Sequence, residues 1–217
     1  MFADRNNAGF KLVEKLRKLS INDPIILSIP DGGIETALPI VECQDTAFDL
    51  IILEKLLIPN KPEWSFGTIT EDGTVAFNDY EKFVNQEEKK ILIAEAKQRL
   101  GNRILQFRDS ENKLDISNRN VIIVDDGANH GTTLQACINS CKKRKVKSIT
   151  IAVPVLSTRV LNELSPRVSN IVSLFNSTEF KGINHYYRNS KTLDKPLLKE
   201  RLKVLMSYKR KKEVQLA

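Results

Sequence analysis

The feature that most constrains the fold of this chain is a series of five short, mostly apolar runs. They lie at residues 25–29, 48–53, 121–124, 149–153 and 171–174. Runs of this length, bounded by turn residues, are typical of strands that are buried on both faces of a parallel sheet. Segments with helical character separate most of them, at residues 34–42, 132–143 and 157–164. This alternation predicts an α/β fold with a doubly wound, mostly parallel five-stranded sheet.

The segment after the second run interrupts the alternation. Residues 66–70 and 74–77 have strand character and flank Glu71-Asp72-Gly73, a sequence typical of a hairpin turn. A long charged helix is predicted next, at residues 86–108. We therefore predict one domain, residues 1–194, with a hairpin-plus-helix insertion at about residues 58–110. Residues 195–217 are predicted to form a basic C-terminal helix or tail.

The composition excludes several classes of protein. The chain has 217 residues, of which 41% are hydrophobic, enough for one compact core. It contains no run of about 18 apolar residues, as a membrane span needs, and no signal-peptide pattern. Cys43, Cys137 and Cys141 form no CxxC pair, and His130 and His185 are the only histidines. The sequence therefore predicts a cytoplasmic protein with reduced thiols, no membrane contact and no metal site of its own.

The net charge of +7 is concentrated near the C-terminus. Eight basic and two acidic residues lie within residues 195–213, which leaves the rest of the chain near +1. A second basic run, at residues 142–145, is expected at a helix end, where the helix dipole favours cations. Solvated surfaces explain both runs, because basic runs alone are weak signals of nucleic-acid binding. Nucleic-acid contact through the tail stays open as an alternative, and so does a homodimer.

Residues 121–133 are the most informative about chemistry. Four β-branched residues are followed by Asp125 and Asp126, then by a turn of small residues, and a helix is expected from about Thr132. The amides of such a turn and the first free N–H groups of the helix bind anions, and Gly127 and Gly131 permit a close approach. The predicted phosphate-binding loop consists of Gly127, Ala128, Asn129, His130, Gly131, Thr132 and Thr133.

The acid pair beside this loop needs a ligand of its own, because bare carboxylates would repel the phosphate. Carboxylates accept hydrogen bonds from sugar hydroxyls, and a nearby Mg²⁺ would offset their charge. A phosphate at one end and adjacent hydroxyls at the other describe a ribose 5-phosphate. Asp125 and Asp126 are therefore the candidate catalytic residues, as acceptors for the ribose hydroxyls.

The same segment resembles the phosphoribosyl-diphosphate motif of type I phosphoribosyltransferases: four apolar residues, two acids and a short loop rich in threonine and glycine. Residues 29–33 resemble the pyrophosphate loop of this family. Further similarities to one subgroup lie at residues 2–5, 54–55, 58–63, 66–67, 152–155, 180 and 186–187. The resemblance thus covers nearly the whole chain except its basic tail.

This resemblance implies a phosphoribosyltransferase-like fold and a role in nucleotide metabolism. The implied reaction transfers a 5-phosphoribosyl group from 5-phosphoribosyl 1-diphosphate to a nitrogenous base, with release of pyrophosphate and with Mg²⁺ bound mainly through the substrate. The insertion would close as a lid. The residues implied for pyrophosphate are Asp31, Gly32, Gly33 and Lys55, with a plain surface lysine as the alternative for Lys55. Tyr186 and Tyr187 are candidates for stacking on the base, with a place in the core or at an interface as the commoner alternative for such aromatic residues.

Two positions depart from the pattern of the family. Asp31 stands where the subgroup usually has an arginine, and His130 stands where the phosphate loop normally has serine or threonine. An acid beside pyrophosphate exchanges attraction for a repulsion of about 1–4 kcal/mol. Both departures favour an alternative, a non-catalytic regulator of the same fold that senses phosphoribosyl diphosphate or a nucleotide. The retained insertion favours the enzyme, and the sequence does not specify the acceptor base.

Overall fold

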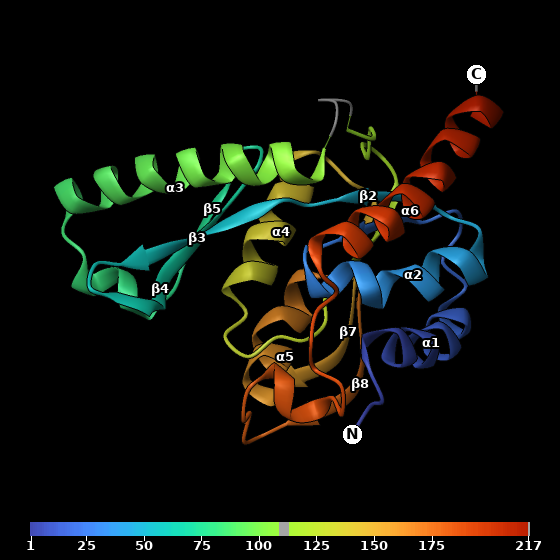
Figure 1. Ribbon diagram of the computed structural model, residues 1–217, viewed down its shortest axis with the longest axis horizontal. Coiled ribbons are helices and arrows are strands. Elements are labelled where there is room, and N and C mark those ends of the chain that lie inside the picture. The colour runs from blue at the N-terminus through green and yellow to red at the C-terminus, as the bar shows by residue number, and fades with distance from the viewer. Residues whose placement is uncertain (109–112, 217) are drawn as a thin grey trace.

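The computed structural model of the protein describes residues 1–108 and 113–216, and the side chains of these residues except at positions 62, 195 and 208–216. The chain forms a central parallel sheet covered by helices on both faces, with a smaller antiparallel sheet and a long helix at one side (Figure 1). No helix of the described residues combines the length and the apolar character that crossing a membrane requires.

The central sheet has the strand order β2-β1-β6-β7-β8, and all its strand pairs are parallel. Its strands are β1 (Ile25–Ser28), β2 (Ala47–Leu50), β6 (Asn120–Val124), β7 (Ser148–Ser157) and β8 (Asn170–Ser177). The predicted five-stranded α/β sheet is therefore confirmed. Ser28 pairs with Val124, so β1 and β6 end side by side. The segments that follow these two strands consequently leave the sheet at the same place.

Helices cover the two faces of the sheet. They are α1 (Arg5–Leu16), α2 (Gly32–Gln44), α4 (Thr132–Lys143), α5 (Thr158–Leu164) and α6 (Lys195–Leu216), with short 3₁₀ segments η1 (Arg17–Leu19), η3 (Ser165–Arg167) and η4 (Ile183–Tyr186). Successive strand residues face opposite sides. Ile26 and Ile122 pack in one core with α1, α2 and α6, whereas Ile25 and Ile123 pack in the other with α4 and α5.

The insertion contains one strand more than the sequence predicts. It comprises β3 (Leu53–Ile58), β4 (Lys61–Thr70), β5 (Val75–Phe77), η2 (Asp79–Phe83) and α3 (Gln86–Phe107), and its strands form an antiparallel sheet in the order β3-β4-β5. The predicted hairpin at residues 71–73 joins β4 to β5, and α3 packs on β3 and β4. The predicted strand at 48–53 is wrong at its end, because β2 stops at Leu50 and β3 begins at Leu53. No glycine or proline separates the two strands in the sequence.

Helix α6 shows that the segment predicted as a basic C-terminal helix or tail also contributes to the core. Its residues Leu198, Leu202 and Leu205 are buried, and they belong to the same hydrophobic core as α1 and α2. The helix packs on α2 and β2 (Figure 1). The spacing of the three leucines places them on one helical face. The basic side chains at 209–212 lie outside the described residues.

Candidate functional site

A cavity of about 430 Å³ opens at the carboxyl edge of the central sheet. Residues 29–32 after β1 and residues 125–134 after β6 form two of its sides. Strands β3 and β4 contribute a third side together with Arg103 of α3, and Ile183 completes the wall. Ligands of open α/β sheets bind at this edge, where neighbouring loops diverge. The structure thus brings together the two loops that the sequence analysis singled out separately.

Asp126 is held in a buried ion pair. The Nε atom of Arg5 donates to its Oδ2 at 2.7 Å, and the two side chains are only 4% and 12% exposed. The hydroxyl of Tyr187 donates to the backbone oxygen of Asp126 at 2.6 Å. A Cβ atom at Gly32 would lie 2.2 Å from Asp126 Oδ2, so α2 begins directly against this carboxylate. Sequence reasoning missed Arg5 as a site residue, although the segment 2–5 was part of the family resemblance.

Asp125 has a different environment and faces the cavity. Its Oδ1 accepts a hydrogen bond from the backbone N–H of Asp126 at 2.8 Å, and no cation forms an ion pair with it among the described residues. Burial and the neighbouring carboxylate of Asp126 raise the pKa of Asp125 well above its usual value. The two acids are therefore not equivalent. Both line the cavity, but Asp126 is paired with Arg5, whereas Asp125 has no ion pair in the described structure.

The predicted phosphate loop leads into an uncapped helix. Helix α4 begins at Thr132, and its N-cap, Gly131, has a φ of 77° and provides no side-chain cap. The first N–H groups of a helix have no partner within it, so those of α4 are available to an anion at the cavity wall.

Ala128 differs from the rest of the predicted phosphate-binding loop, because its backbone amide already has a partner. Its N–H donates to Val155 O at 2.9 Å, and its carbonyl accepts from the N–H of Ser157 at 2.9 Å. These bonds pin the loop to the end of β7. The candidate anion site is therefore confined to residues 129–133, and the prediction that Ala128 offers its amide to the phosphate is wrong.

His130 is exposed at the rim of the cavity. Partial burial and the positive charges of Arg159 and Lys55 lower its pKa, which disfavours the charged imidazolium in the absence of an anion. Lys55, predicted to contact pyrophosphate, does line the cavity.

The loop after β1 is joined to the insertion. Arg103 Nη2 donates to Asp31 Oδ1 and to Pro30 O, both at 3.1 Å. Gly32 lines the cavity in the first turn of α2, and the Pro30–Asp31 peptide bond is cis. Gly33 packs instead against the sheet, because a Cβ atom there would lie 2.9 Å from Val124 O. Asp31 thus faces a guanidinium that sequence reasoning did not find.

The two predicted base-stacking tyrosines do not line the cavity in the described structure. Tyr187 is 3% exposed, packs against Phe2 and lies beneath the guanidinium of Arg5. Its buried ring leaves no face for a base, so this prediction is wrong. Tyr186 packs against Phe175 and Phe180. Both tyrosines belong to the small core that supports the cavity rather than to its surface.

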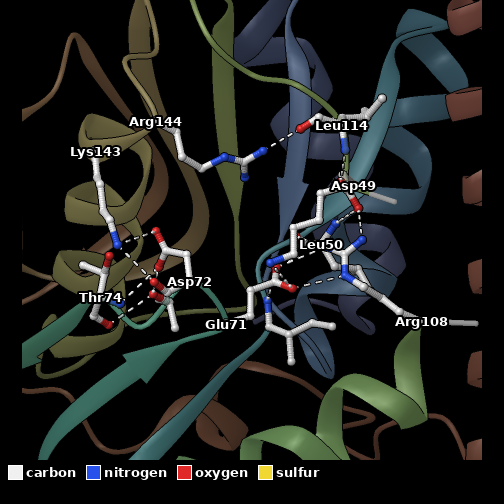
Figure 2. A network of polar contacts seen from close by, with 12 residues as sticks. Asp49, Leu50, Glu71, Asp72, Thr74, Arg108, Leu114, Lys143 and Arg144 are labelled. Atoms are coloured by element: carbon white, nitrogen blue, oxygen red, sulfur yellow. Dashed lines mark hydrogen bonds and ion pairs between the residues drawn. The ribbon is translucent and has the colours of Figure 1, made fainter. Parts of the chain in front are cut away.

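A buried network fixes the end of α3 to the central sheet (Figure 2). Arg108 Nη1 lies 2.7 Å from Asp49 Oδ1, and its Nη2 lies 3.1 Å from Glu71 Oε1 and 2.8 Å from Leu50 O. Asp49 Oδ2 also accepts from the N–H of Leu114 at 2.8 Å. The network joins the end of β2, the β4–β5 turn and the end of α3. It therefore positions the wall of the cavity that carries Arg103 and Lys55.

The fold and the site define an α/β protein with a candidate anion-binding loop and two carboxyl groups at the edge of a parallel sheet. Residues 73–188 match a family model described as a phosphoribosyl transferase domain. This match covers more than half of the chain, and the chain belongs to that family.

Similar proteins agree with this assignment. Two Mycobacterium tuberculosis proteins, Rv0571c and MT0597, are named as proposed phosphoribosyl transferases and are each 28% identical over 192 residues. The match covers 87% of this chain but only 43% of either relative, so the chain spans less than half their length. The crystal structure of TT1426 from Thermus thermophilus superposes with a TM-score of 0.78 at 25% identity, and the match covers 93% of this chain and 97% of that one.

Proposed function

We propose that the cavity binds 5-phosphoribosyl 1-diphosphate and that the protein transfers its phosphoribosyl group to a nitrogenous base. This proposal is supported by the arrangement of two loops, residues 29–32 and 125–134, which line the same cavity. The uncapped start of α4 suits the 5-phosphate, Asp125 lies beside it for the ribose hydroxyls, and Gly32 with Lys55 borders the remaining space for the diphosphate. A volume of about 430 Å³ is within the usual range for a small-molecule site.

The proposed reaction is a displacement at C1 of the ribose. The bond from C1 to the diphosphate oxygen breaks, pyrophosphate leaves with the electron pair, and a ring nitrogen of the base forms the new bond and loses its proton. Positive charge develops on the ribose and negative charge on the leaving group. The residues around the cavity would act by positioning the two reactants and by stabilising the leaving group.

The acidic residues of the cavity fit a Mg²⁺ ion that is held mainly by the substrate. No group of three or more His, Cys, Asp or Glu residues in the described structure could hold a metal by itself. Asp31, Glu54, Asp125 and Asp126 line the cavity, and of these Asp125 alone has no ion pair with an arginine among the described residues. Mg²⁺ favours substrate phosphate oxygens plus one or two carboxylates, and when bound it neutralises charge on the diphosphate.

Binding of 5-phosphoribosyl 1-diphosphate with Mg²⁺ is expected to stabilise the protein. At a ligand concentration of 100 times Kd the gain is about 2.7 kcal/mol, which raises the Tm of a domain of this size by about 5–11 °C. Differential scanning fluorimetry measures this shift. The absence of a shift at millimolar ligand would contradict the proposal. Pyrophosphate release with a panel of bases then distinguishes the enzyme from a regulator, which binds without forming product.

The two acids are expected to respond differently to replacement by asparagine. Asp125→Asn should weaken binding of phosphoribosyl diphosphate about tenfold or more and leave binding of inorganic phosphate nearly unchanged, because a hydrogen bond to a charged group is worth about 1.5–3 kcal/mol. Asp126→Asn should instead lower the free energy of unfolding by about 2 kcal/mol, because the buried Arg5 loses its counter-charge while the asparagine oxygen can still accept its hydrogen bond. Calorimetry and urea unfolding measure the two effects. An equal loss of affinity for both ligands in the Asp125→Asn variant would show that Asp125 does not contact the ribose.

A further inference from the structure

Arg103 is an incompletely satisfied arginine at the cavity wall. It comes from α3, and its Nη2 is the only one of its nitrogen atoms with a hydrogen bond to the described residues. Its Nε is buried and has no hydrogen-bond partner among them. A guanidinium has five N–H donors in a planar fork. Most of the donor capacity of Arg103 is therefore unused beside the loop that follows β1.

Asp31 is a weak partner for this arginine. The carboxylate and the guanidinium are joined by one contact of 3.1 Å, and their side chains are 44% and 28% exposed. Single ion pairs with this exposure contribute little to stability. A diphosphate carries more negative charge and can accept two parallel hydrogen bonds from the fork, which is the stronger arrangement. An anion at Gly32 could thus replace Asp31 as the partner of Arg103.

We propose that Arg103 is the cation that binds the diphosphate and that Asp31 competes with the diphosphate for it. This inference rests on the proposed function and concerns a residue in the insertion, far in sequence from both loops. The positive charge is supplied from α3, and Asp31 orients the guanidinium over the start of α2.

The experiment measures binding of inorganic pyrophosphate and of ribose 5-phosphate by calorimetry without Mg²⁺. Arg103→Gln is expected to weaken pyrophosphate binding at least tenfold and to leave ribose 5-phosphate binding within twofold of the unmodified protein. Arg103→Lys keeps the charge but not the fork, so an intermediate loss is expected. Asp31→Asn removes the competing charge and should strengthen pyrophosphate binding severalfold.

Lys90→Gln is the control. Lys90 lies on the same helix, pairs with Glu87 at the exposed surface and does not line the cavity. It should leave pyrophosphate binding unchanged, and the thermal midpoint of each variant reports whether it is folded.

The outcomes separate this inference from the proposed function. Unchanged pyrophosphate binding in a folded Arg103→Gln variant that still binds ribose 5-phosphate overturns the role of Arg103 alone. Weaker binding in Asp31→Asn overturns the competition. If the unmodified protein binds neither ribose 5-phosphate nor phosphoribosyl diphosphate, the proposed function itself is wrong.

Discussion

Replacing Arg108 with methionine is expected to lower the free energy of unfolding by about 3–5 kcal/mol, the usual cost of removing one partner from a buried ion pair. Arg108 lies between Asp49 and Glu71, and all three side chains are at most 5% exposed (Figure 2). Methionine fills part of the same volume but removes the cation that Asp49 and Glu71 share, and Glu71 keeps only its ion pair with Lys113 among the described residues. Urea unfolding monitored by circular dichroism measures the change.

Arg99→Met provides the comparison for this variant. Arg99 forms an ion pair with Glu54, and the two side chains are 40% and 19% exposed. The free energy of unfolding is therefore expected to fall by less than about 1 kcal/mol. A similar small loss in Arg108→Met would show that the buried network does not stabilise the attachment of the insertion. The Arg108 variant should also bind phosphoribosyl diphosphate less tightly, because the network positions the cavity wall that carries Lys55 and Arg103.

Removing α6 by ending the chain at Asp194 is expected to have the largest effect on stability. The truncation deletes Leu198, Leu202 and Leu205 from the core. Burying a leucine stabilises a fold by about 1.5–3 kcal/mol, so three contribute about 5–9 kcal/mol. That is comparable to the whole stability of many domains. We therefore expect a chain that is mostly unfolded at 25 °C, as judged by circular dichroism and hydrogen exchange.

A second truncation separates the core role of α6 from its charge. Ending the chain at Ser207 keeps all three buried leucines and removes the basic run at 209–212. This shorter deletion should leave the Tm within a few degrees of the full chain and should not change binding of phosphoribosyl diphosphate. A folded, stable chain ending at Asp194 would show instead that α6 is dispensable.

The composition of the C-terminal segment shows why charge is a poor guide to packing. Its many basic residues obscured a regular series of leucines that lies on one face of the helix. A helix can carry both kinds of residue, because its leucines face the core while its long basic side chains face the solvent. The hydrophobic spacing was present in the sequence, and periodicity was the better signal.

The order of the central strands and helices was determined by the sequence itself. Buried strands require continuous apolar runs, and a tight turn before a helix requires small residues, so both leave local patterns. The same holds for the segment from Asp125 to Thr133, where one stretch of chain contains the strand end, the acid and the helix start. The sequence could therefore indicate the anion site without any knowledge of distant residues.

Only the tertiary structure decided which partner each polar side chain has. Arg5 pairs with Asp126 across 121 positions of sequence, and Arg103 reaches Asp31 from the insertion. Tyr187 was predicted to face a ligand but is buried against Phe2. Such pairings depend on how distant elements pack, and a single charged or aromatic residue carries no local pattern that identifies its partner. The sequence alone therefore indicated segments that line one cavity, whereas the different environments of Asp125 and Asp126 became visible only in the folded chain.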